Sequence, residues 1–188
     1  MTVWFTSDLH FGHRLVAGLR GFGEDVDAHD AALVKNWCRV VHPKDQVWVL
    51  GDIAVSSPYS ALELVAELPG RKHLIAGNHD ACHPMHREAH RFQKNYLMAF
   101  ESVQAFARRR IAGQEVLLSH FPYDKDRFEV RYTQYRLRDE GRWLLHGHTH
   151  LADQRREGRE IHVGVDAWDF TPVNLNTIYE LMSSESGA

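Results

Sequence analysis

Five short apolar runs along the chain each stop at Asp, Asn or His. The runs cover residues 3–7, 47–51, 73–77, 116–119 and 143–147, and the polar residues after them are Asp8, His10, Asp52, Asn78, His79, His120, His148 and His150. Short runs of apolar, β-branched and aromatic residues predict strands that are buried on both faces. Ligands of open α/β sheets bind beyond the carboxyl ends of such strands, so the pattern predicts one site formed by these polar residues.

The segments between and after these strands carry different patterns. Residues 27–41, 57–70 and 84–98 each place apolar side chains at helical spacing, and the second segment begins with a Ser-Pro pair and ends with a Pro-Gly pair. We therefore predict three helices. Residues 161–181 return to apolar and β-branched positions, which predict closing strands separated by turns at Gly164 and Pro172.

Length and composition narrow the class of protein. The 188 residues favour a single domain over residues 1–182, followed by a flexible tail over residues 183–188. The chain has no long apolar span and no amino-terminal leader, and it has only two cysteines, so we expect a cytoplasmic protein with no membrane contact. A formal charge of −3 gives no electrostatic footprint for tight nucleic-acid binding, so nucleic acid is not indicated as a partner. The sequence gives no indication of the oligomeric state.

The residue types at the strand ends have a shared chemistry. Imidazoles and carboxylates together with an amide oxygen suit Mn, Fe, Co, Ni or Zn better than Mg or Ca. Two divalent ions bring four positive charges, whereas Asp8 and Asp52 return only two negative ones, so the surplus attracts an anion and acidifies bound water. A pair of such ions about 3.5–4 Å apart can clamp both oxygens of a phosphoryl transfer. The pattern therefore predicts metal-assisted phosphoester hydrolysis.

Five motifs occur in a fixed order, and together they resemble one family. They are Asp8-Leu9-His10, Gly51-Asp52, Gly77-Asn78-His79-Asp80, His120 and Gly147-His148-Thr149-His150. In this set and order the sequence resembles the calcineurin-like metallophosphoesterases. The Phe11-Gly12-His13 extension and the segment over residues 163–168 are similar to the small uncapped bacterial and phage members. The resemblance implies an α/β fold, a four-layer α-β-β-α sandwich with two mixed β-sheets.

The resemblance also implies roles for individual residues. A first metal would be held by Asp8, His10 and His150, a second by Asn78, His120 and His148, and Asp52 would bridge them. His79 would be catalytic, as general acid or transition-state stabiliser, with Asp80 beside it as a supporting residue. The implied cofactors are two divalent transition-metal ions, with Mn favoured over Fe, Ni, Co or Zn, and a hydroxide bridging them would attack phosphorus in line.

One departure from the family bears on the substrate. Asp52 is followed by Ile53 and Ala54, where the protein Ser/Thr phosphatases have Arg and Gly. A dianionic monoester loses a clamp without that arginine, so we expect a phosphodiesterase that acts on small nucleotide-type diesters, 2′,3′-cyclic nucleotides among them. The alternatives are a phosphomonoesterase or nucleotidase, a nuclease of the same fold, or a non-catalytic metal-binding scaffold.

Two interpretations remain open for several residues. His13, Tyr123 and Arg127 are candidates for substrate contact, although a capping or surface role explains His13 equally well. Residues 121–142, which include Arg131, Tyr132, Tyr135 and Arg136, form either a nucleotide-contacting lid or a solvated segment with nearly balanced charge. For His83, His86 and His90 we favour a solvated helical face over a separate metal site. Arg108 to Arg110 are interpreted first as a charged hairpin edge.

Overall fold

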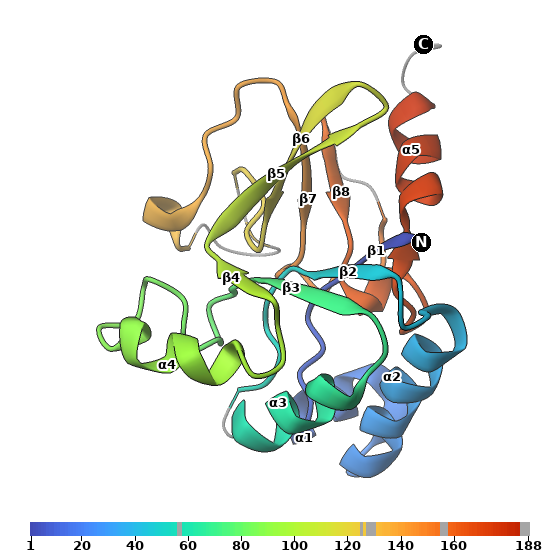
Figure 1. The fold of residues 1–188 in the computed structure, drawn as a ribbon, viewed down its shortest axis with the longest axis vertical. Coiled ribbons are helices and arrows are strands. Elements are labelled where there is room, and N and C mark those ends of the chain that lie inside the picture. The colour runs from blue at the N-terminus through green and yellow to red at the C-terminus, as the bar shows by residue number, and fades with distance from the viewer. Residues whose placement is uncertain (56–57, 125, 127–130, 155–157, 185–188) are drawn as a thin grey trace.

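The computed structural model describes residues 1–55, 58–124, 126, 131–154 and 158–184. Two β-sheets lie against each other (Figure 1). The first has the strand order β4-β3-β2-β1-β9. Its strands are β1 (Val3–Thr6), β2 (Gln46–Val49), β3 (Arg71–Ile75), β4 (Ser102–Gln104) and β9 (Val173–Asn174). Strands β1 to β4 are parallel and β9 is antiparallel to β1, so this sheet is mixed.

The second sheet has the order β5-β6-β7-β8. Its strands are β5 (Phe106–Ile111), β6 (Gln114–Ser119), β7 (Trp143–His146) and β8 (Glu160–His162). Strand β5 pairs antiparallel with β6 and the others are parallel, so this sheet is also mixed. Ala112 and Gly113 both have positive φ in the tight turn between β5 and β6, as a twisted hairpin requires. The hairpin-edge interpretation of Arg108 to Arg110 is confirmed, because β5 lies at the sheet edge.

The described residues form five α-helices and three short helical segments. The α-helices are α1 (Arg14–Ala17), α2 (Val26–Val40), α3 (Pro58–Glu67), α4 (Ala89–Tyr96) and α5 (Leu175–Ser183), and the short segments are η1 (Gly18–Phe22), η2 (Thr133–Tyr135) and η3 (Val165–Ala167). Helices α1 to α4 lie on the side of the first sheet that faces away from the second (Figure 1). No described helix combines the length and apolar character needed to cross a bilayer.

Two apolar clusters follow from the alternation of side chains along the buried strands. On β2, Val47 and Val49 pack toward the helices with Leu33 and Trp37 of α2, whereas Trp48 points into the layer between the sheets. Phe5 of β1 also lies in that layer, with side chains from β6, β7 and β8. Each central strand of the first sheet is therefore apolar on both faces. This arrangement confirms the predicted α/β fold with two mixed sheets.

Two predicted elements are corrected. Residues 84–98 contain a helix only over α4, because residues 78–88 form successive turns, in which the amides of His83, His86 and Ala89 each donate to the carbonyl three residues earlier. Residues 175–183 form α5 and not a strand. Asn174 caps this helix by accepting from the amide of Thr177 (2.9 Å). Strands β8 and β9 remain from the predicted closing strands, and residues 185–188 of the tail lie outside the described residues. The single domain over residues 1–182 stays a prediction.

Candidate metal centre

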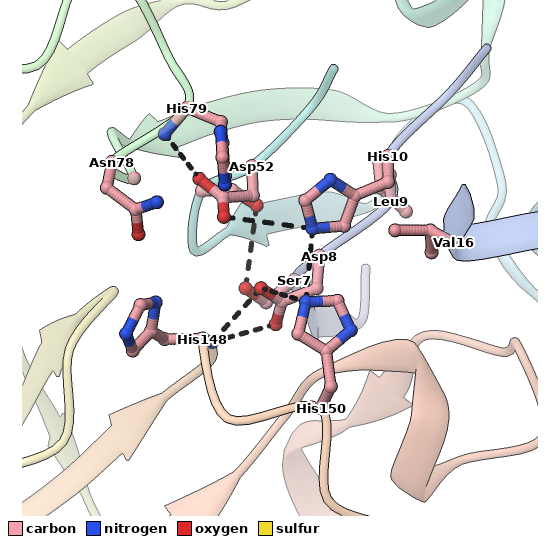
Figure 2. A network of polar contacts seen from close by, with 12 residues as sticks. Ser7, Asp8, Leu9, His10, Val16, Asp52, Asn78, His79, His148 and His150 are labelled. Carbon is pink, nitrogen blue, oxygen red and sulfur yellow. Dashed lines mark hydrogen bonds and ion pairs between the residues drawn. The ribbon is translucent and has the colours of Figure 1, made fainter. Parts of the chain in front are cut away.

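The loops after β1, β2, β3 and β7 meet where the two sheets adjoin (Figure 2). Within the first sheet, the amide of Asp8 donates to the carbonyl of Gly51 (3.0 Å) and that of His10 to Asp52 (3.0 Å). Between the sheets, the amide of His148 donates to both carboxylate oxygens of Asp8 (3.0 Å each). The strand ends therefore hold each other through backbone contacts, and the side chains that follow them converge.

Strained backbone conformations concentrate at this junction. Five of the predicted ligands have positive φ, namely Asp8 (59°), His10 (51°), Asp52 (58°), His148 (71°) and His150 (51°). A non-glycine residue in this region costs about 1–3 kcal/mol, and such residues cluster at functional sites. The strain is therefore a sign of function that is independent of residue chemistry.

The first group of converging side chains contains Asp8, His10 and His150. One nitrogen or carboxylate oxygen from each lies within 4.8 Å of the others. Nε2 of His10 is 3.1 Å from Nε2 of His150, which is 3.8 Å from Oδ1 of Asp8. Asp8 and His10 are buried and His150 is partly exposed. These three atoms face one point, which is where a cation would bind.

The second group contains Asp52, His120 and His148, again with ligand atoms within 4.8 Å of one another. Nε2 of His120 lies 3.4 Å from Oδ2 of Asp52 and 3.0 Å from Oδ1 of Asn78. The same Oδ2 of Asp52 is 3.7 Å from Nε2 of His10, a member of the first group. Asp52 thus stands between the two groups, and Asn78 adds an amide oxygen to the second.

The donor set fits two divalent transition-metal ions. It offers four imidazoles, two carboxylates and one amide, the mixture that borderline metals prefer. Nδ1 of His120 donates to the carbonyl of Leu50 (2.7 Å), so Nε2 is the nitrogen that a cation would bind once its proton is displaced. Two candidate metal sites therefore lie side by side, whereas the assignment of each ligand to one ion stays a prediction.

Glycines let the backbone approach these side chains closely. A Cβ at Gly77 would lie 2.3 Å from Oδ1 of Asp52, and one at Gly147 would lie 1.9 Å from Oγ of Ser7 and 2.6 Å from Oδ2 of Asp8. No side chain fits at such separations. The glycines of the Gly77 and Gly147 motifs are thus required by the packing of the carboxylates, a physical reason for the motif pattern.

The side chains of the centre shift one another's pKa values. Burial opposes ionisation of Asp52, but the neighbouring His120 and His10 outweigh it and hold the pKa of this carboxyl well below its usual range. Burial acts against charge on His120 too, yet the charge of Asp52 raises its pKa to about 9. Burial and His120 together lower the pKa of His148 to about 3. A cation that binds here must therefore displace a proton from His120.

His79 and Asp80 are adjacent in sequence but face different surroundings. The side chain of His79 is exposed, its ring centroid is 5.6 Å from that of His10, and its amide donates to Oδ1 of Asp52 (2.9 Å). Asp80 is fully buried and accepts from the amides of Gly77 (2.7 Å), Asp52 (3.0 Å) and Ile53 (3.1 Å). Burial and the charge of Asp52 raise the pKa of Asp80 to about 7. The geometry leaves His79 open to a substrate and assigns Asp80 to holding the loops.

The three predicted substrate contacts differ in outcome. His13 caps α1, since its Nδ1 accepts from the amide of Val16 (3.1 Å), and its ring centroid is 5.8 Å from that of His10. Tyr123 donates its hydroxyl to the carbonyl of Arg142 (3.1 Å), and this contact gives no support to a substrate role. Arg127 lies outside the described residues.

The interpretation of His83, His86 and His90 as a solvated helical face is wrong for His83 and His86. His83 is buried, with its ring 5.8 Å from that of Phe121. Nε2 of His86 donates to the carbonyl of Asn78 (2.9 Å), so His86 supports the loop of a predicted ligand. His90 is exposed on α4 as expected. His83 and His86 turn inward because they precede the helix and lie in the turns over residues 78–88.

Four residues that contact the predicted ligands or their partners escaped the sequence analysis as supports, although Asp126, Arg136 and Asp166 occur in segments that it singled out. Asp166 contacts His150, and Arg20 contacts Asp166. Asp126 contacts His148, and Arg136 contacts Asp126. These contacts join residues of different loops, and the one between Arg20 and Asp166 spans 146 positions, so neither spacing nor periodicity could have revealed them.

Comparison with known proteins agrees with this geometry. The family model for the calcineurin-like phosphoesterase superfamily domain matches residues 1–166. The chain is 47% identical to the gene 66 protein of Mycobacterium phage L5, over 96% of this chain and 93% of that protein, and 46% identical to the gene 66 protein of Mycobacterium phage D29, over 92% of each. A solved structure of a protein of unknown function from Aquifex aeolicus is similar with a TM-score of 0.69 and 26% identity, over 96% of this chain and 98% of that one. The chain therefore belongs to the calcineurin-like phosphoesterase superfamily.

Proposed function

We propose that this protein is a metal-dependent phosphodiesterase that hydrolyses small nucleotide-type diesters, and that Mn is its preferred metal. The observation that carries the proposal is the position of Asp52 between two buried ligand groups, with the exposed His79 beside them. Two divalent cations bound at these groups would generate a nucleophile from water at neutral pH and neutralise charge on the phosphate.

Residues of the protein itself would donate a proton to the leaving oxygen and hold the ligands in place. The imidazole of His79 is exposed and close to His10, so it can donate a proton to the leaving oxygen of a diester bound over the centre. Its backbone amide is fixed on Oδ1 of Asp52, which keeps the imidazole at the centre. The carboxylate of Asp80 gathers three amides of two ligand-bearing loops and so keeps Asp52 and Asn78 in place.

A preference for diesters is supported by the arginines near the centre. Among the described arginines, Arg20, Arg131 and Arg136 contact an aspartate that lies beside a predicted ligand, so each is already paired with a carboxylate. Ile53 and Ala54, where a related phosphatase would carry a cationic clamp, are buried and apolar. A second negative charge on a monoester would therefore find less compensation here than the single charge of a diester.

Aromatic rings beside the second ligand group support a nucleotide-type substrate. The ring centroids of Phe121 and Tyr132 lie 5.0 and 5.5 Å from that of His148, and 5.2 Å from each other. Tyr132 is partly exposed and has a positive φ of 59°. A partly exposed ring next to the phosphate position can stack on a base.

The expected cytoplasmic location stays a prediction.

The proposal is tested by metal reconstitution. The chelated protein is supplied with Mn, Ni, Co, Zn or Mg and assayed with bis-p-nitrophenyl phosphate, p-nitrophenyl phosphate and 2′,3′-cyclic AMP. We expect activity to return with about two equivalents of a transition metal and to favour the diesters. Two bound ions without turnover on any of the three esters would overturn the proposal and favour a non-catalytic scaffold.

Variants assign the activity to this centre. Asp52→Asn removes the shared carboxylate, and His79→Ala removes the proposed acid, so each should lower kcat by about 100-fold or more. His90→Ala is the matched control, because His90 is an exposed histidine on α4, and it should leave kcat unchanged. Wild-type rates from folded Asp52→Asn and His79→Ala proteins would show that the reaction occurs elsewhere.

A further inference from the structure

A pair formed by a buried arginine and a partly exposed aspartate lies behind His150, one of the predicted ligands of the first group. Nδ1 of His150 donates to Oδ2 of Asp166 (3.1 Å), which leaves Nε2 facing His10. Arg20 binds Asp166 in bidentate fashion, with Nε donating to Oδ1 and Nη2 to Oδ2, both at 2.8 Å. Only 3% of the Arg20 side chain is exposed. The first group is therefore supported by a chain of contacts that runs from Arg20 through Asp166 to His150.

A second pair of the same kind lies behind His148, in the second group. Nε2 of His148 lies 3.0 Å from Oδ1 of Asp126, so Nδ1 is the nitrogen that remains for a cation. Nη2 of Arg136 donates to the same aspartate, and the two side chains are 4% and 6% exposed. Arg136 also donates to the carbonyl of Pro122 (2.8 Å). The neighbouring histidines of one motif are thus each supported by their own aspartate and arginine.

Arg20 reaches the first group by a second route. Its Nη2 donates to the carbonyl of Asp8 (2.7 Å) and its Nη1 to that of Leu9 (3.2 Å). Nη1 also donates to Nε2 of His29 (3.0 Å), whose Nδ1 then donates to Oδ1 of Asp30 (2.7 Å). Arg20 therefore ties η1 and α2 to the loop that carries the first predicted ligand.

The chemistry of these contacts explains why both members of each pair are needed. A carboxylate that accepts from one imidazole nitrogen fixes the tautomer and ring orientation and makes the other nitrogen a stronger ligand. A buried carboxylate alone is costly, and a bidentate arginine offsets that cost without reaching the metal. Because Arg20 and Arg136 neutralise their aspartates, the pairs add basicity to the ligands but little net charge to the centre.

We propose that Asp166 and Asp126 are positioning residues that set the affinities of two separate cation sites, held in place by Arg20 and Arg136. Asp166 acts on the Asp8, His10 and His150 site, and Asp126 on the Asp52, His120 and His148 site. This inference rests on the proposed function only in requiring that the two groups bind cations. Arg136 is accordingly a structural partner of Asp126 and does not contact the substrate.

The test is a Mn titration of chelated full-length protein by calorimetry, with the dinuclear signal in electron paramagnetic resonance as a second readout. Wild type should bind two ions. Asp166→Asn should weaken one site by about 10–100-fold and leave the other unchanged, and Asp126→Asn should weaken the other site by a similar factor. Glu101→Gln is the matched control, because Glu101 forms an exposed bidentate pair with Arg71, and it should change neither site.

Double variants that combine His10→Ala with each aspartate substitution identify which cation site each aspartate supports. His10→Ala removes the first site, so adding Asp166→Asn should change nothing further in the affinity for the remaining ion. Adding Asp126→Asn to His10→Ala should weaken the remaining ion by about 10–100-fold. Arg20→Lys keeps the charge but loses the bidentate contact, and should weaken the first site alone. This milder variant keeps the test informative should Asp166→Asn not fold.

The outcomes separate this inference from the proposed function. Unchanged titrations of Asp166→Asn, Arg20→Lys and Asp126→Asn would overturn it, as would equal weakening of both sites by one of these variants. A purely structural role would lower the thermal stability of the chelated protein without splitting the two affinities, and that result also counts against the inference. Two tight sites in a wild type that hydrolyses no ester would refute the phosphodiesterase proposal and leave this inference open to the same titration.

Discussion

Nε2 of His10 and Nε2 of His150 lie 3.1 Å apart, although 140 positions separate the two residues in the sequence. At most one hydrogen can lie between these nitrogens. Oδ2 of Asp52 and Oδ1 of Asp8 lie 3.7 and 3.8 Å away on the same side. Two imidazoles and two carboxylates that converge in this way form a set of ligands that a bound cation would hold together.

Removal of metal should therefore lower the thermal stability. A cation present at about 100 times its Kd adds about 2.7 kcal/mol to the free energy of unfolding, which corresponds to roughly 5–10 °C in Tm for a chain of this size. We expect chelation to lower Tm by this amount and Mn to restore it, as measured by differential scanning calorimetry. In His10→Ala the gain on adding Mn should be smaller. A Tm that is the same with chelator and with Mn would contradict the prediction.

Close packing of backbone against Asp52 makes Gly77 intolerant of a side chain. A Cβ there would lie 2.3 Å from Oδ1 of Asp52 and 2.9 Å from Cε1 of His120. Gly77→Ala should therefore lower the free energy of unfolding by about 1–3 kcal/mol. It should also weaken Mn binding, as followed by calorimetry, because both displaced side chains are predicted ligands.

The control for Gly77→Ala is Gly113→Ala in the β5–β6 turn. A Cβ at Gly113 meets nothing within 4 Å, although its φ of +79° strains any other residue. This variant should lose about 1 kcal/mol of stability and keep full Mn affinity. Equal Mn affinities for the two variants would show that crowding at Gly77 does not reach the ligands.

The sequence predicted the ligands of the metal centre better than the aspartates and arginines behind them, and the reason is physical. Strands such as β2 and β7 can be predicted from local apolar patterns, and the polar residues that follow them must meet at the sheet edge. Arg20 and Asp166 are 146 positions apart, and their contact depends on how η1 and η3 pack, which no local pattern encodes. The same limit explains α5, since apolar residues at positions 173–182 fit either a strand or a helix until Asn174 is seen to cap one.

The hydrogen bonds that Asp45 accepts predict a loss of stability in acid. Its carboxylate accepts from the amide of Thr2 (2.7 Å), Nε1 of Trp4 (3.1 Å) and the amide of His42 (3.1 Å). These donors, the Thr2 amide first, lower the pKa of Asp45 below its usual value. A lowered folded pKa means that the stabilisation is present above the unfolded value of about 3.9 and is lost as pH falls through the folded pKa.

Asp45→Asn should therefore cost about 1–2 kcal/mol at pH 7, because hydrogen bonds to a charged acceptor are replaced by weaker neutral ones. Below about pH 3.5 the difference from wild type should shrink, since Asp45 becomes protonated in both states. Urea unfolding at both pH values measures this. Asp153→Asn, at an exposed carboxylate, should match wild type throughout. A pH-independent difference would mean that the charge of Asp45 is not what stabilises the amino terminus.

Asp80 and His79 should separate into a positioning residue and a catalytic one. Asp80 accepts three amide hydrogen bonds in a fully buried position, and Asp80→Asn turns one side of that acceptor into a donor facing other donors. A buried polar group left unsatisfied costs about 1–3 kcal/mol, and more when it is charged. Asp80→Asn should thus lower the free energy of unfolding by at least that amount.

His79→Ala should instead leave the free energy of unfolding within about 0.5 kcal/mol of wild type, because exposed substitutions rarely cost more. Its effect should appear in kcat. Urea unfolding and steady-state rates on bis-p-nitrophenyl phosphate, measured on both variants, decide between the roles. If Asp80→Asn lost only turnover and kept its stability, Asp80 would have to face the substrate, which its three amide partners do not allow in this structure. If the two variants separate as expected, the motif at residues 77–80 combines two opposite tasks, since Asp80 fixes the loops and His79 stays free to meet the ester.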